Sequence, residues 1–168
     1  MTFDKEIYIL EMSRLLADSI KTLNKHHKDF LVYSVNIWTD PNAAISAINF
    51  DSKDNSDKAI KSSNDFNKKY YDNYIQAGDT EQAKLFEQTI TRNCNPADFE
   101  LAQFATIENT SFQADWEENS NGGCWDILEE ALKEFAVMAI DKLHTMNLHP
   151  EFELSVNGRE DWYMFTWK

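Results

Sequence analysis

Three carboxylates and a tryptophan lie together in one short segment, Asp115-Trp116-Glu117-Glu118, a few residues before a Gly-Gly break. Paired carboxylates beside an aromatic platform serve glycoside hydrolysis, in which one carboxyl group is held protonated and the other ionised. Carboxylate oxygens also bind divalent cations. A carboxylate-based hydrolase or a divalent-cation-binding protein is therefore one functional hypothesis for this chain.

The same segment has the composition of a protein-recognition surface. Charged side chains speed association, and tryptophan is typical of the anchors that contribute most of the binding energy. We favour this second hypothesis: a non-enzymatic protein-binding module, for example a bacterial immunity-type protein that neutralises a basic partner such as a nuclease toxin. The alternative is that Trp116 and Trp125 are ordinary core residues. The candidate partner-binding residues are Asp115, Trp116, Glu117, Glu118, Trp125 and Asp126.

No cysteine or histidine pattern predicts a catalytic or metal site. Cys94 and Cys124 are far apart, so the chain has no C-x-x-C motif. Cys124 precedes a predicted helix that would stabilise a thiolate, but acids follow it, and a small buried thiol is the simpler interpretation. The four histidines lack the spacing of metal ligands. We assign no catalytic residue, no metal ligand and no cofactor.

Glycine and proline are scarce, with 4 Gly and 3 Pro in 168 residues. The glycines cannot form a G-x-G-x-x-G fingerprint, a phosphate-binding loop or a G-x-S-x-G elbow. Nucleotide-loop enzymes and elbow hydrolases are thereby excluded, and a domain with long helices and strands is favoured.

The net charge of −13 is unevenly distributed. Residues 1–84 carry 11 bases and 13 acids (−2), whereas residues 85–168 carry 5 bases and 16 acids (−11). Between Arg92 and Lys133 there is no basic residue. Because phosphate contacts need lysine or arginine, we expect no nucleic-acid partner. A basic protein partner is the class that this charge favours.

Length and hydropathy predict one domain spanning residues 1–168. The first residues include acids where a signal peptide needs bases, and no segment has the roughly 20 apolar residues of a membrane span. Two cysteines in a chain of this size suit a reducing compartment. We therefore expect a cytoplasmic protein without a membrane partner.

Hydrophobic periodicity predicts helices over residues 4–25 and 125–146, each with one apolar stripe. Ser56 is the predicted cap of another helix that ends near Gly78, and a shorter helix is expected to include Ile90. Strands are predicted at 30–38, 44–50, 99–107, 152–156 and 162–167, with turns at 40–42 and 157–158.

These elements predict an α+β fold: an antiparallel sheet of four to five strands with helices packed on one face. Both ends of the chain have the order helix, strand, turn, strand. We therefore predict a pseudo-repeat of architecture, although the two halves share little residue identity.

Residues 31–40, continuing into 44–50, resemble an uncharacterised bacterial family, the "domain of unknown function" family numbered 4303. The segment Asn95-Pro96-Ala97-Asp98-Phe99 is similar to a Pro-x-acid-aromatic turn of that family, with Phe99 where tryptophan is expected. The helix at 124–146 and the final strand also fit. The resemblance implies a bacterial α+β domain and supplies no catalytic residue.

Overall fold

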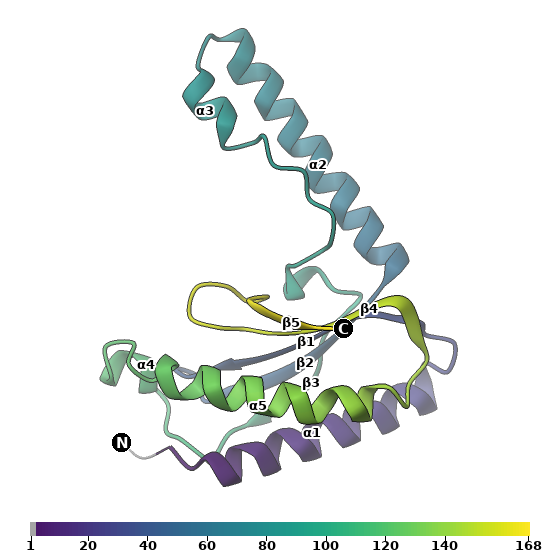
Figure 1. Cartoon of the computed structure of the whole chain (residues 1–168), viewed down its shortest axis with the longest axis vertical. Helices are drawn as coiled ribbons and strands as arrows, with labels where there is room; N and C mark the ends of the chain where they lie inside the picture. The colour runs from purple at the N-terminus through teal and green to yellow at the C-terminus, as the bar shows by residue number, and fades with distance from the viewer. Residues whose placement is uncertain (1–2) are drawn as a thin grey trace.

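A five-stranded mixed sheet forms the centre of the fold in the computed structural model, which describes residues 3–168. The strands stand in the order β3-β2-β1-β4-β5 (Figure 1). β1 pairs with β4 in parallel, and the other neighbours are antiparallel. Their bounds are β1 Val32–Asp40, β2 Ile45–Ser52, β3 Leu101–Glu108, β4 Leu148–Val156 and β5 Phe165–Trp167.

The α+β class and the number of strands are as predicted, but the prediction of a purely antiparallel sheet is wrong. A parallel pair needs a crossover connection, and helix α5 (Trp125–Leu143) provides it by delivering β4 beside β1. Local hydrophobic patterns identify strands but do not say which strands become neighbours. The error therefore concerns pairing rather than secondary structure.

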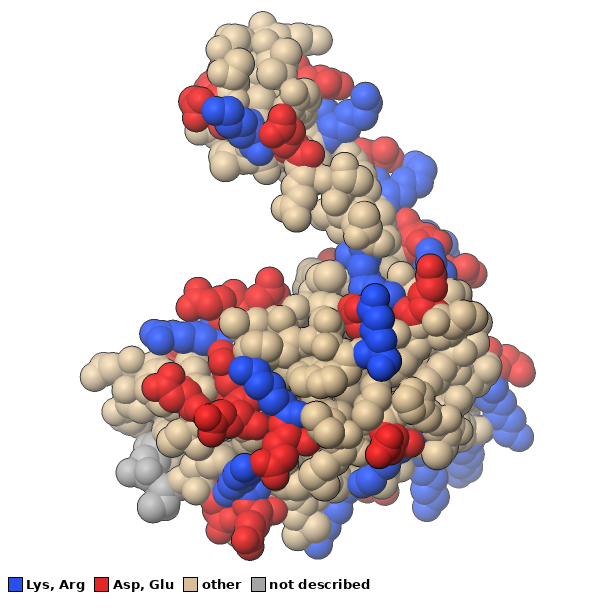
Figure 2. Space-filling view, viewed as in Figure 1, with Lys and Arg blue, Asp and Glu red and all other residues tan. Residues whose placement is uncertain are grey.

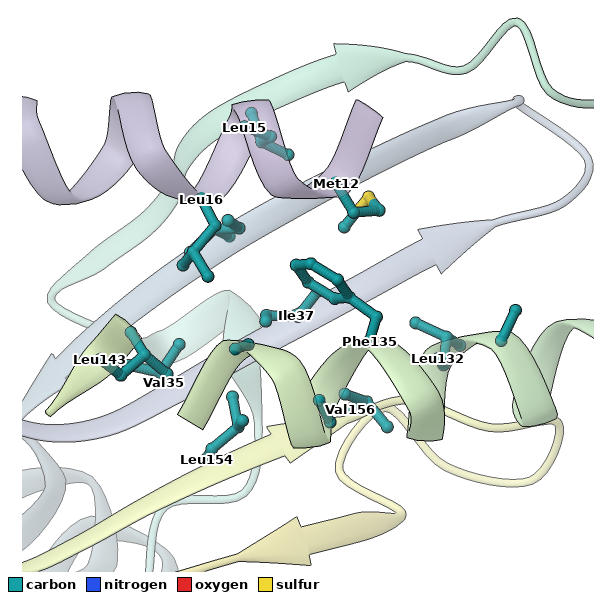
Figure 3. Close-up of a cluster of buried hydrophobic side chains, with 14 of the residues drawn as sticks. Met12, Leu15, Leu16, Val35, Ile37, Leu132, Phe135, Leu143, Leu154 and Val156 are labelled. Carbon is teal, nitrogen blue, oxygen red and sulfur yellow. The ribbon is translucent and has the colours of Figure 1, made fainter. Parts of the chain in front are cut away.

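Helices α1 (Lys5–His26) and α5 lie side by side on one face of the sheet (Figure 1). Their apolar stripes, predicted from sequence, are buried against β1 and β4 (Figure 3). The Asp4 carboxylate caps α1 by accepting a hydrogen bond from the Ile7 amide at 3.0 Å. The core combines aliphatic and aromatic side chains, including Met12, Leu16, Ile37, Leu132, Phe135 and Leu154.

A helical arm leaves the sheet after β2 and projects away from the body (Figure 1). It consists of α2 (Lys53–Gln76) and the short α3 (Thr80–Lys84). Ser52, not the predicted Ser56, caps α2, and Ser56 is buried instead. Helix α3 ends at Lys84 rather than including Ile90. The prediction that helices pack on one face of the sheet therefore describes α1 and α5, whereas α2 projects away from the sheet.

β4 and β5 pair as the predicted antiparallel hairpin, but their connection is longer than the predicted turn at 157–158. Asn157 does not form a tight turn, because its side chain continues the sheet by bonding to the main chain of Thr39, accepting from N at 3.0 Å and donating to O at 3.0 Å. Residues 157–164 form a loop, here called the β4–β5 loop, before the short β5.

The pseudo-repeat is not confirmed. The order helix, strand, strand does recur, but β1 and β4 are parallel neighbours whose antiparallel partners, β2 and β5, lie on opposite sides. Both helices nevertheless cover the same face of the sheet (Figure 1). No rotation can superpose two units arranged in that way.

The other face of the sheet is polar. Ser34, Asn36, Asn49 and Ser155 are at most 1% exposed. They are covered by the later part of residues 88–99, here called the covering strap, and by the β4–β5 loop. The first residues of the strap bond to α2. The strap includes a short 3-10 turn at Pro96–Asp98. None of the helices within residues 3–168 is long and apolar enough to cross a membrane.

Candidate functional site

The two tryptophans of the predicted binding surface are buried. Trp116 begins the short helix α4 (Trp116–Asn119) and is 4% exposed, and Trp125 begins α5 and is 6% exposed. Trp116 stacks on Phe3 with ring centroids 5.1 Å apart and lies equally close to Phe112. The predicted role of these two tryptophans as exposed anchors is therefore wrong, and the core alternative describes them.

The acids around those tryptophans remain accessible. Asp115, Glu118 and Asp126 are exposed. Glu117 is half-buried and held in place: its Oε1 accepts a hydrogen bond from the Trp125 indole N–H at 2.8 Å. Trp125 thus orients a carboxylate instead of meeting a partner itself.

A cavity of about 280 Å³ opens beside Glu117, at the end of the sheet where β1 and β4 both finish. It is bounded by the turn after β1, the start of α5 and the β4–β5 loop. Four carboxylates and one guanidinium line it, and we call it the acidic hollow. Its charged lining residues are Asp40, Glu117, Arg159, Glu160 and Asp161. Figure 2 shows acidic side chains, with a few basic ones among them, gathered over this end of the molecule.

Local hydrogen bonds fix the Asp40 and Asp161 carboxylates of the acidic hollow. Asp40 Oδ1 accepts from the amides of Asn42 and Ala43 at 2.8 and 3.0 Å, which closes the turn after β1. Asp161 Oδ1 accepts from the Tyr163 amide at 2.9 Å. The acidic groups therefore stand on short, well-bonded turns, and negative charge is concentrated without long flexible segments.

Trp162, which was not among the predicted site residues, lines the acidic hollow and is 52% exposed. Its carbonyl accepts a hydrogen bond from the fully buried Asn36 side chain at 2.8 Å, so the loop backbone is tied to the polar face of the sheet. The residue was assigned to a strand at 162–167. Its signal was the sequence Glu160-Asp161-Trp162 after an Asn-Gly pair, which has the same acidic and aromatic composition as the chosen segment.

A buried polar network joins the β4–β5 loop to β4 and to the covering strap. The Tyr163 hydroxyl donates to Glu153 Oε1 at 3.0 Å, and Arg92 Nε of the covering strap lies 3.6 Å from the same oxygen. Burial, together with the neighbouring carboxylate of Glu153, raises the pKa of Tyr163. Within residues 3–168, every buried side-chain nitrogen or oxygen has a hydrogen-bond partner. This network positions the loop.

The carboxylates of the acidic hollow can bind cations and accept hydrogen bonds from donor groups of a partner. No group of three or more His, Cys, Asp and Glu residues within 3–168 is arranged to hold a metal ion. Burial raises the pKa of both thiols, Cys94 and Cys124, which disfavours a nucleophilic thiolate. The hollow does bring Glu117 near other carboxylates, and the hydrolase alternative stays a prediction.

The pKa of Asp51 is raised, which is the property that a general acid needs, but this carboxyl group lies outside the acidic hollow. It is buried beneath the covering strap, and burial outweighs the hydrogen bonds that it accepts from Glu100 N and from the side chains of Asn55 and Asn93. Asp51 holds the strap and does not line the acidic hollow.

No protein-family model matches this chain, and neither a curated protein nor a solved structure is detectably similar to it. The resemblance to the family numbered 4303 therefore stays a prediction.

Proposed function

We propose that this protein is a non-enzymatic binding module that takes a basic protein partner on the acidic end of its sheet. The observation that carries the proposal is the acidic hollow, where four carboxylates face one guanidinium in a cavity held by short turns. The exposed acids Asp115, Glu118 and Asp126 extend the negative surface beyond it.

The long-range field supports the same partner class. The half of the chain that contributes most of this surface has a balance of −11, from 5 bases and 16 acids in residues 85–168. A concentrated negative surface speeds encounter with a positively charged protein and disfavours polyanions. An immunity-type role, in which the module neutralises a basic toxin encoded beside it, is the cellular function that we propose.

The test is binding to the product of the neighbouring gene, measured by calorimetry at two salt concentrations. Affinity should fall as salt rises, because screening weakens charge attraction between partners. The variant Glu160→Lys should lose about tenfold in affinity, since it reverses one charge in the hollow. Glu118→Lys should act in the same direction from the surrounding surface.

A matched control separates local contact from net charge. Glu87→Lys makes the same charge change at an exposed position just before the covering strap. Its affinity should stay within about threefold of the wild-type value, because long-range steering changes association rates more than affinity. Equal losses for Glu87→Lys and Glu160→Lys, or binding that does not respond to salt, would contradict the proposal.

A further inference from the structure

We propose that Trp162, Trp38 and Pro96 form a pocket for an apolar side chain of an extended, basic segment of the protein partner. The inference rests on the proposed function and adds to it the kind of sequence that the partner presents. The pocket has a volume of about 260 Å³ and is completed by Asn49, Asn95, Ala97 and Gln103.

The two tryptophan rings give the pocket its shape. They meet edge to face, with centroids 5.7 Å apart and an interplanar angle of 81°, so they form two walls at nearly a right angle. Pro96 belongs to the 3-10 turn of the covering strap. Such a corner suits an aliphatic or proline side chain, which gains contact with two ring faces without needing a hydrogen bond.

The side-chain amides of Asn49 and Asn95, which line this pocket, already have partners within the protein. Asn49 Nδ2 donates to Asn36 O and Oδ1, both at 3.2 Å, and Asn49 Oδ1 accepts from Gln103 N at 2.6 Å. Asn95 Nδ2 donates to Asp98 Oδ2 at 2.7 Å. Because these groups are engaged within the protein, the rings provide the recognition, and an apolar occupant fits better than a polyhydroxylated one.

The exposed ring is held in place before a partner arrives. The peptide unit after Trp162 is bonded twice, by Asn36 at the Trp162 carbonyl and by the Asp161 side chain at the Tyr163 amide. The peptide unit before Trp162 is also bonded, since the Asp161 carbonyl accepts from Gly158 N at 2.9 Å. A large aromatic group that is exposed yet fixed contributes binding energy at a low cost in conformational entropy. Half-exposed tryptophans of this kind are typical of interface hot spots.

The pocket adjoins the acidic hollow, and the charge of that hollow indicates the kind of segment that occupies both. Trp162 lines both this pocket and the acidic hollow, so a single ring separates a cation site from an apolar site. An extended peptide places neighbouring side chains on opposite sides, and alternate residues about 7 Å apart. A segment with a lysine or arginine close to a leucine, valine or proline can fill both sites at once.

The experiment titrates the full-length, ¹⁵N-labelled protein with three peptides and follows the tryptophan indole N–H signals. The probes are Gly-Lys-Leu-Lys-Leu-Gly, Gly-Lys-Ser-Lys-Ser-Gly and Gly-Glu-Leu-Glu-Leu-Gly, all capped at both ends. We expect the Lys/Leu peptide to shift the Trp162 and Trp38 signals and to bind about tenfold more tightly than the Lys/Ser peptide. The Glu/Leu peptide should shift neither signal.

Variants keep the inference falsifiable. Trp162→Phe removes one indole signal, which assigns it, and retains a ring, so it should retain most of the affinity for the Lys/Leu peptide. Trp162→Ala should bind the Lys/Leu peptide no better than the Lys/Ser peptide, with Trp38 as the reporter. Leu85→Ala, which changes an exposed apolar residue just after α3 of the arm, should bind like the wild type.

The possible results separate the pocket from the proposed function. Equal binding of the Lys/Leu and Lys/Ser peptides would overturn the pocket and leave the acidic binding surface standing. Equal binding of the Lys/Leu and Glu/Leu peptides would leave an apolar pocket but overturn the basic partner. Concentration-dependent shifts of Trp162 without peptide, or shifts caused by cellobiose, would assign the pocket to a second copy or to a sugar and overturn the inference.

Discussion

Arg92 fastens the covering strap to the polar face of the sheet. Its Nη1 donates to Ser34 Oγ at 2.6 Å and to Tyr33 O at 3.3 Å, and its Nη2 donates to Glu151 O at 2.6 Å. The guanidinium also lies 3.8 Å from the centroid of the Tyr33 ring and pairs with Glu153 at 3.6 Å. We therefore expect replacement of Arg92 to destabilise the fold strongly.

The magnitude follows from what Arg92→Ala leaves behind. Glu153 keeps a carboxylate in a side chain that is only 11% exposed, with the Tyr163 hydroxyl as a donor and Lys168 at 3.9 Å. Breaking one side of a buried ion pair costs about 3–5 kcal/mol, and the 15% exposure of Arg92 places this pair near the lower figure. A loss of about 3 kcal/mol lowers Tm by about 6–12 °C in a chain of this length.

Equilibrium unfolding in urea measures this loss directly. Arg92→Lys should cost less than Arg92→Ala, because an ammonium keeps the charge but cannot form the forked contacts. Adding Glu153→Gln to Arg92→Ala should recover part of the loss, since the uncompensated buried charge disappears. The exposed Arg159→Ala is the control and should stay within about 0.5 kcal/mol of wild type. An Arg92→Ala variant as stable as this control would refute the reasoning.

Two further predictions concern other buried polar contacts. Asn36→Ala should weaken binding of the Lys/Leu peptide by about threefold to tenfold and speed hydrogen exchange in the β4–β5 loop, since the Trp162 carbonyl loses its buried donor; unchanged exchange would count against this. Burial acts to raise the pKa of Glu11, but hydrogen bonds from residues 109–111 outweigh it and lower that pKa in the folded protein. The stability that Glu11 contributes is therefore present above about pH 4 and is lost as pH falls through the lowered pKa, so wild type and Glu11→Gln should differ in urea midpoint at pH 7 and converge at low pH; an equal difference at both pH values would contradict this.

Local structure was largely readable from the sequence. The helices α1 and α5 follow from apolar residues three and four positions apart, and β1 and β2 from a β-branched and aromatic run around an Asp-Pro turn. Both signals depend on a side chain's position relative to its own backbone, which a few neighbouring residues determine. The boundary errors, such as Ser56 in place of Ser52 as a helix cap, arise because several residues near a helix start can act as its cap.

The candidate site was only half predictable. The accumulation of acids could be read from the sequence because charge can be counted along the chain, and the structure places Glu117 of that segment in the acidic hollow. The exposure of a side chain cannot be counted in that way. Trp116 and Trp125, the hypothesised anchors of the binding surface, are buried, whereas Trp162, which that hypothesis did not include, is 52% exposed. A tryptophan is buried or exposed according to what packs on it from distant parts of the chain.

The sequence by itself determined the class of fold, the concentration of negative charge in residues 85–168 and the absence of the two glycine-rich nucleotide-binding motifs. Tertiary structure decided that β1 lies parallel to β4, because strand order depends on crossovers and long-range packing. It also decided that the turn after β1, the start of α5 and the β4–β5 loop meet around one hollow. Those segments lie far apart in the chain, and they come together because parallel strands end at the same edge of a sheet.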